Sequence, residues 1–204
     1  EFFLSVSSQT TTGGRSFVSA VGDIRNYTSF YAEYGWSERL TVGLDAGYGA
    51  GEDNAAASAL VFARLPVWSP GEQKVAAEFG IGWITSDQDG EQVRLRPGIA
   101  WGRGFESHWG GGWLGMESSI EYRSPGSGTI FKADFTAGLK PTERWMLIGQ
   151  VQTGIYPDND EPVLRLVPSV VRRIGPRLHM QIGPVLDIFG GDGIGVRASF
   201  WYGN

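Results

Sequence analysis

The 204-residue sequence has no hydrophobic run long enough for a membrane-spanning helix, which needs roughly 18 or more consecutive apolar residues. Only 41% of its residues are hydrophobic, so a search for apolar helices would pass over it. This absence excludes a helical membrane protein. It does not exclude a transmembrane barrel, because barrel strands alternate apolar and polar residues and contain no long apolar run.

Cysteine is absent, which fits export through the oxidising periplasm. Basic residues are fewer than acidic ones, 17 against 22, and the formal net charge is −5. We therefore expect no nucleic-acid partner, because proteins that bind nucleic acids carry basic patches. The sequence shows no signal peptide, and we expect Glu1 to be a mature N-terminus from which an export signal has been removed.

Histidine is scarce, with His108 and His179 as the two examples. The acidic clusters that could partner them lie at the other ends of the predicted strands, on the order of 20 Å away given the rise of a strand. A histidine beyond hydrogen-bond reach cannot act as a base with them. Ser107 adjoins His108, but adjacency in sequence does not build a catalytic triad. We expect no enzyme activity, no metal site and no cofactor.

Alternation of apolar and polar residues is instead the dominant pattern of the sequence. About twelve segments of roughly ten residues each alternate apolar and polar residues with the two-residue period of a strand. In residues 39–49, apolar side chains such as Leu44 alternate with polar or small ones such as Asp45. The second face is charged and glycine-rich in segment after segment, as expected where lipid lies outside and water inside. The pattern predicts an all-β fold, a single transmembrane antiparallel up-and-down β-barrel domain over residues 1–204.

Turn signals divide the chain into predicted strands at 2–9, 26–36, 39–49, 56–67, 74–85, 93–103, 112–123, 129–140, 144–156, 163–173, 177–188 and 193–202. An even strand number puts both termini on one side, which we expect to be the periplasm. The long 10–25 connection then lies outside, where it could fold into the barrel or extend it. Residues 104–111 would form an unusually long periplasmic turn, for which the sequence gives no physical reason.

Aromatic residues on the predicted outward face gather near the strand ends. Trp36, Trp101, Trp145, Phe200 and Tyr202 lie near the periplasmic ends, and Tyr48, Trp83, Tyr122 and Phe131 near the outer ends. Aromatics favour strands in general, but barrels also place aromatic girdles at the two lipid interfaces. We therefore expect localisation to the outer membrane of a Gram-negative bacterium, with outer-membrane lipids and lipopolysaccharide as partners.

The predicted inward face carries charges of both signs in nearly equal number. The predicted pore-lining residues are Glu33, Asp45, Arg64, Glu78, Arg94, Arg96, Glu117, Glu121, Lys132, Asp134, Arg165, Asp187 and Arg197. Strand order puts Glu121 between Arg94 and Lys132, and Asp187 between Arg165 and Arg197. Such ladders either satisfy the interior of the barrel or form a polar constriction that selects hydrated solutes.

Two further features bear on the lumen and its mouth. The inward positions include many glycines, which we expect to leave space for a narrow water path. The predicted outer loops are acidic, with Glu52, Asp53, Asp87, Asp89, Glu91, Asp158, Asp160, Glu161 and Asp192. These acidic groups either concentrate cations at the mouth or are ordinary solvated turn residues.

The hairpin at residues 31–49, YAEYGWSERLTVGLDAGYG, resembles the second and third strands of the channel-like outer-membrane proteins of the MetA-pathway phenol-degradation family. A Tyr-rich strand, a tight turn with an acidic residue beside Arg, and a Leu-Thr-Leu-Gly strand recur there. The resemblance covers about twenty residues closely and the rest only in pattern. It implies a barrel of about twelve strands that moves small molecules, and it carries over no functional residue.

Three functions follow from this reading. We expect a porin-like channel that transports small polar or amphipathic solutes across the outer membrane. The alternative is a non-conducting structural barrel whose loops anchor lipopolysaccharide or a partner protein. A soluble twelve-stranded ligand binder would require the apolar faces to point inward, and folding without detergent would establish it.

Overall fold

The structure is a computed structural model that describes residues 2–12, 24–51, 55–125, 128–157, 162–191 and 193–203. Its strands are β1 (Phe2–Thr12), β2 (Ile24–Ser37), β3 (Leu40–Gly51), β4 (Ala55–Trp68), β5 (Gln73–Ser86), β6 (Gly90–Ser107), β7 (Gly110–Ser124), β8 (Thr129–Lys140), β9 (Trp145–Ile155), β10 (Val163–Arg173), β11 (Leu178–Phe189) and β12 (Ile194–Gly203). The part of the chain that is described contains no helix long and apolar enough to cross a membrane.

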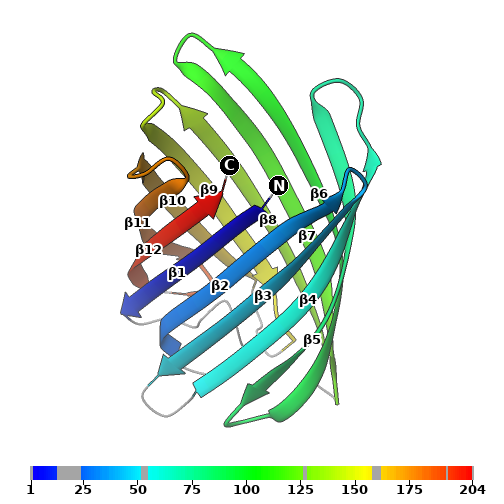
Figure 1. The fold of residues 1–204 in the computed structure, drawn as a ribbon. Helices are drawn as coiled ribbons and strands as arrows, with labels where there is room; N and C mark the ends of the chain where they lie inside the picture. Colours follow the sequence, from blue (N-terminus) through cyan, green and yellow to red (C-terminus); the bar gives the residue numbers. More distant parts are fainter. Residues whose placement is uncertain are drawn as a thin grey trace.

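The twelve strands close into one antiparallel barrel, as the alternation predicts (Figure 1). Each strand pairs with its neighbours in sequence, and β1 closes the barrel against β12 in a ladder from Phe3↔Gly203 to Thr12↔Ile194. Both ends of the chain therefore lie at one end of the barrel, here called the terminus end. The opposite end, which holds the β5–β6 connection, is called the loop end. The predicted 10–25 connection falls mainly on residues 13–23, outside the described residues.

The prediction of a long turn over residues 104–111 is wrong. Strand β6 continues to Ser107 and β7 starts at Gly110, so only two residues connect them. The Ser107 hydroxyl donates to the Gly110 carbonyl at 2.7 Å, and Gly110 adopts a φ of 116°, which favours glycine. The β6–β7 hairpin reaches beyond its neighbours at the terminus end (Figure 1). Glycines in GFESHWGG obscure the alternation, which explains why the sequence pattern suggested a loop.

The exterior of the barrel is apolar. Large hydrophobic side chains such as Val61, Ile81 and Ile182 are exposed in the middle of their strands. The aromatic residues form the expected pattern, with Trp36 and Phe200 exposed near the terminus end and Tyr48 and Tyr122 exposed near the loop end. A surface with so many exposed hydrophobic side chains is stable only in contact with lipid.

Inward glycines do not widen the lumen as expected, because side chains from neighbouring positions fill the space beside several of them. A Cβ atom on Gly47 would lie 2.0 Å from the hydroxyl of Tyr27, and one on Gly138 would lie 2.2 Å from the ring of Trp113. A strand glycine opposite an aromatic residue lets the ring lie flat on the backbone. These two glycines therefore make room for rings rather than for water, whereas a Cβ on the inward Gly102 or Gly115 would meet no atom closer than 3.8 Å.

The inner wall is also less uniformly polar than the sequence pattern predicts. The inward positions of β10 and β11 include Val167, Val171 and Val185, which are fully buried. At the loop end, Ile130, Tyr156 and Val163 form an apolar cluster inside the barrel. The charged residues are consequently concentrated on the wall formed by β2 to β7.

Candidate functional site

A cavity of about 360 Å³ lies inside the barrel. Side chains from opposite walls line it, including Tyr31 from β2, Arg64 from β4, Arg96 from β6 and Arg197 from β12. They meet there because inward positions alternate with lipid-facing ones along each strand. The cavity is the candidate functional site.

A row of alternating charges crosses the cavity wall. The Arg64 guanidinium donates to Glu78 Oε2 from Nη2 at 2.8 Å and from Nε at 3.1 Å. These two residues are directly paired across β4 and β5. Arg96 donates to the other Glu78 oxygen at 3.3 Å and to Asp45 Oδ2 at 2.7 Å. Glu78 therefore bridges two arginines that come from different strands.

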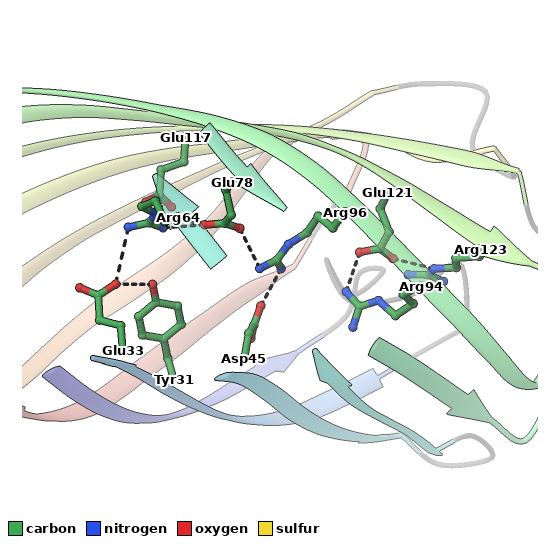
Figure 2. Close-up of polar contacts among 10 residues, drawn as sticks. All are labelled: Tyr31, Glu33, Asp45, Arg64, Glu78, Arg94, Arg96, Glu117, Glu121 and Arg123. Atoms are coloured by element: carbon green, nitrogen blue, oxygen red, sulfur yellow. Dashed lines mark hydrogen bonds and ion pairs between the residues drawn. The ribbon is translucent and has the colours of Figure 1, made fainter. Parts of the chain in front are cut away.

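The row continues toward the terminus end. Arg64 Nη1 lies 3.5 Å from Glu33 Oε2, which also accepts a hydrogen bond from the Tyr31 hydroxyl at 2.8 Å. Arg64 Nη2 also approaches Glu117 Oε1 at 3.4 Å. One arginine thus contacts carboxylates from three strands. We call Glu33, Arg64, Glu78, Arg96 and Asp45 the charge row, and Figure 2 shows it extending along the lumen.

A second group, here called the loop-end cluster, consists of Arg94, Glu121 and Arg123 (Figure 2). Glu121 accepts from Arg94 Nη2 at 2.5 Å and from Arg123 Nε at 2.7 Å. Strand order correctly placed Arg94 beside Glu121. The second hydrogen bond comes from Arg123, two residues along β7. Lys132, which strand order also placed beside Glu121, interacts with it electrostatically and forms no ion pair with it among the contacts described.

The charged side chains of the loop-end cluster are more buried than those of the charge row. The exposed fraction decreases from 66% at Glu117 and 22% at Arg64 to 0% at Glu121. Arg165 and Asp187, which pair at 2.6 Å, are equally buried at the loop end of β10 and β11. The lumen is therefore open on the side of the termini and closely packed near the loops.

The remaining predicted residues lie on the inner face as well. Lys132, Asp134 and Arg197 line the cavity. Arg197 donates to Gln9 Oε1 at 3.0 Å and to Gln150 Oε1 at 3.4 Å, so Asp187 pairs with Arg165 without also bridging to Arg197 among the contacts described. Whether the thirteen residues act as a pore lining stays a prediction.

The sequence reasoning missed several luminal residues. Arg123 completes the loop-end cluster, and Tyr27, Tyr31 and Gln9 line the cavity. Each of the four lies an even number of residues along its strand from a charged residue already assigned inward, or directly opposite such a residue on the paired strand. Each side chain therefore points into the lumen. The two-residue alternation along each strand could have identified these residues, whereas a search for charged residues alone did not.

Three buried polar atoms in the lumen have no hydrogen-bond partner among the described residues. They are the Nε atoms of Arg94 and Arg96 and the Oδ1 atom of Asp134. Buried polar groups are almost always hydrogen-bonded, to protein or to water. We therefore expect water molecules in the lumen to form hydrogen bonds with these three atoms.

Of the predicted outer acidic residues, Asp87, Asp89 and Glu91 belong to the described part of the chain. Asp87 accepts a hydrogen bond from the Ala55 backbone N–H at 2.9 Å, which ties the β5–β6 turn to the start of β4. This carboxylate has a structural role. Glu52, Asp53, Asp158, Asp160, Glu161 and Asp192 lie outside the described residues.

The two histidines lie in different settings. His108 packs against Trp109 in the β6–β7 turn, with ring centroids 4.2 Å apart and the rings tilted by 48°, and the Ser107 hydroxyl beside it donates to a backbone carbonyl. His179 faces the lumen near Trp201. Within the described ranges, no group of His, Asp and Glu side chains is arranged to hold a metal ion.

Solved structures with the same fold are outer-membrane proteins. The KdgM porin in complex with disordered oligogalacturonate matches with a TM-score of 0.71, at 4% identity and 99% coverage of both chains. The NanC porin matches with a TM-score of 0.70, at 10% identity, covering 98% of this chain and 100% of that one. An outer membrane channel from Pseudomonas putida F1 matches with a TM-score of 0.67, at 9% identity, covering 98% and 94%.

No protein-family model and no curated protein matches the sequence. The predicted family resemblance therefore holds only at the level of an outer-membrane barrel with a channel-type fold. With its apolar exterior, the chain has the fold of bacterial outer-membrane porins and channels, in agreement with the predicted localisation.

Proposed function

We propose that this protein is a narrow outer-membrane channel for small polar or amphipathic solutes. The observation that carries the proposal is the cavity of about 360 Å³ inside the barrel, which is lined by charged and hydroxyl-bearing side chains. In this proposal residues 1–204 form one barrel domain, the termini face the periplasm, and the thirteen charged residues predicted from the sequence line or support the path.

The luminal polar groups favour a hydrated path over a dry plug. Arg64 and Glu117 are partly exposed inside the barrel, and Asp134 Oδ1 needs a partner that the described protein atoms do not supply. A barrel of about twelve strands is wider than one of eight strands, whose side chains fill it. Water beside the charge row satisfies these groups and provides a route for hydrated solutes.

The charge row gives the channel a means of selection. Asp45, Arg64, Glu78 and Arg96 come from four consecutive strands and present both signs to the same cavity. Rings and clusters of charged side chains select among ions in narrow pores. The buried loop-end cluster and the Arg165–Asp187 pair make the loop half the narrow part of the path.

The similar structures support the channel over the non-conducting structural barrel, since their names describe porins and a channel. The resemblance of residues 31–49 to a channel-like family points the same way and is part of this proposal. An enzymatic role is not proposed, because neither histidine has the partners of a catalytic base among the contacts described.

Single-channel recording in planar lipid bilayers tests the proposal. The refolded barrel, verified as folded by its heat-modified gel mobility, is expected to produce small, steady current steps. Liposomes containing the barrel are expected to admit small sugars and amino acids and to exclude oligosaccharides. A folded, inserted barrel that gives neither current nor solute entry would contradict the channel and favour the structural barrel.

A further inference from the structure

A second cavity lies inside the barrel at the terminus end. It has a volume of about 390 Å³ and is lined by inward residues of β1 and of β7 to β12. Its lining differs from that of the central cavity, because rings and cationic groups predominate. We call it the vestibule and define it by Phe3, Trp113, Lys140, Arg173, His179 and Trp201.

The aromatic side chains of the vestibule come from three strands. Phe3 of β1 and Trp201 of β12 pack edge to face, with ring centroids 6.2 Å apart. Trp113 of β7 lies across Gly138, where a Cβ atom would collide with its ring at 2.2 Å. The backbone thus fixes the Trp113 ring in place. These rings provide flat apolar surfaces inside a barrel whose other luminal wall is charged.

Cationic groups stand beside these rings. The Lys140 ammonium lies over Trp113 at 5.5 Å from the ring centroid. The His179 ring, 6.5 Å from Trp201, adds a further flat surface rather than a charge. Arg173 lines the same cavity. Within the described residues, neither Lys140 nor Arg173 has a carboxylate within ion-pair distance. The vestibule therefore offers positive charge that the described protein carboxylates do not neutralise.

We propose that the vestibule binds aromatic carboxylates, with the ring against Trp113, Trp201 and Phe3 and the carboxylate on Lys140 and Arg173. Ammonium and guanidinium groups form strong, charge-assisted hydrogen bonds to carboxylates. Aromatic rings prefer offset or edge-to-face contact with other rings. A volume of about 390 Å³ is within the range of small-molecule sites.

A flat ring suits this lining better than a sugar acid of the same charge. Sugar hydroxyls need hydrogen-bond partners, whereas Met146, Pro176 and the three rings supply apolar contacts. An anion without a ring would leave the aromatic surfaces unused. As a statement about the transported solute the inference rests on the proposed function, but binding can be measured without conduction.

Fluorine NMR titration of the detergent-solubilised barrel tests the site with three probes. They are 4-fluorobenzoate, trifluoroacetate, which lacks a ring, and 4-fluorobenzylamine, which carries the opposite charge. We expect 4-fluorobenzoate to bind at least about tenfold more tightly than either other probe, since each loses one class of contact. The double variant K140M/R173M is expected to weaken 4-fluorobenzoate binding by about tenfold or more.

The matched control is R144M/R172M, which removes the same charge from the same end of the barrel outside the vestibule. Arg172 stacks on the outward Trp145 at 5.4 Å. The control is expected to bind 4-fluorobenzoate like the native barrel. If the double variant does not fold, as judged by gel mobility, R173M alone is expected to weaken binding by about tenfold.

Equal affinity of K140M/R173M and the control would overturn the inference, as would equal binding of trifluoroacetate. Displacement of 4-fluorobenzoate by galacturonate at the same concentration would overturn it in favour of a sugar-acid site. The channel proposal is tested separately. A barrel that binds but does not conduct contradicts the channel, and a conducting barrel that does not bind contradicts the vestibule site.

Discussion

Arg94 and Arg123 lie directly opposite each other on the neighbouring strands β6 and β7. Like charges at opposed positions of a sheet destabilise the pairing. Here Glu121 compensates by accepting a hydrogen bond from each, at 2.5 and 2.7 Å. A single carboxylate therefore holds together two buried arginines at the loop end of the lumen.

Replacing Glu121 with Gln is expected to lower the free energy of unfolding by about 3–5 kcal/mol, the cost of breaking a buried ion pair. The neutral amide leaves two buried guanidinium groups opposite each other. Urea unfolding in lipid vesicles measures the effect. The matched change Glu117→Gln, on the same strand but at a side chain that is 66% exposed, is expected to cost little. Equal losses at the two positions would contradict the role assigned to Glu121.

The inside and outside assignment is tested by placing arginine on each face. Ile81→Arg puts a charge into the lipid near the middle of β5 and is expected to cost about 2–4 kcal/mol. Ser7→Arg puts the same charge into the lumen, where its direct cross-strand neighbours are the uncharged Ser29 and Ser199. We expect the second change to alter stability by less than about 1 kcal/mol. Vesicle folding assays that show equal destabilisation would contradict the facing of these strands.

Gly82 tests the close approach of β4 and β5. A Cβ atom there would lie 2.1 Å from the Ala59 carbonyl oxygen, so the backbone of β4 would have to move. Gly82→Ala is expected to destabilise the barrel by about 1–3 kcal/mol, as overpacking does. Gly102→Ala is the control, because the nearest atom to its Cβ would lie 3.8 Å away. Equal unfolding midpoints for the two variants would contradict the prediction, because they would show that β4 can move away from a Cβ at Gly82 without loss of stability.

Much of the fold follows from the sequence because the lipid and lumen environments impose opposite demands on alternate residues. The predicted strands 129–140 and 163–173 have the observed bounds of β8 and β10. The prediction failed at residues 104–111, where β6 and β7 extend as a hairpin beyond the other strands. Closely spaced glycines there leave few side chains to show the alternation.

The candidate site was predictable in composition but less so in pairing. The two-residue alternation along the strands was enough to assign Arg64 and Glu78 to the inward face, and the structure shows them as direct cross-strand partners. Which long side chain reaches which carboxylate depends on strand tilt and side-chain rotamers, which a linear pattern does not contain. For this reason the second hydrogen bond to Glu121 comes from Arg123, while Lys132 interacts with Glu121 only through its charge.

Arg96 is expected to set the ion preference of the channel. Arg96→Gln leaves Asp45 and Glu78 without one of their cationic partners in the cavity, so cation selectivity should increase. Reversal potentials in a salt gradient measure this change, which should be largest at low ionic strength, where the Debye length reaches about 30 Å at 0.01 M. Arg103→Gln, on the same strand but paired only weakly with Glu72 at 3.9 Å, is the control. An unchanged reversal potential in the Arg96→Gln variant would show that the charge row does not determine the ion selectivity of the channel.

The absence of cysteine allows the central claim, that solutes pass through the lumen, to be measured directly. Ser119→Cys places one thiol in the central cavity, and Val61→Cys places one on the lipid-facing exterior. Each is recorded as a single channel while a charged, membrane-impermeant methanethiosulfonate reagent is added. We expect the current through the Ser119→Cys barrel to fall in one irreversible step, and the Val61→Cys current to stay constant. A Ser119→Cys barrel that is shown by mass spectrometry to be labelled, yet conducts as before, would contradict a path through the lumen.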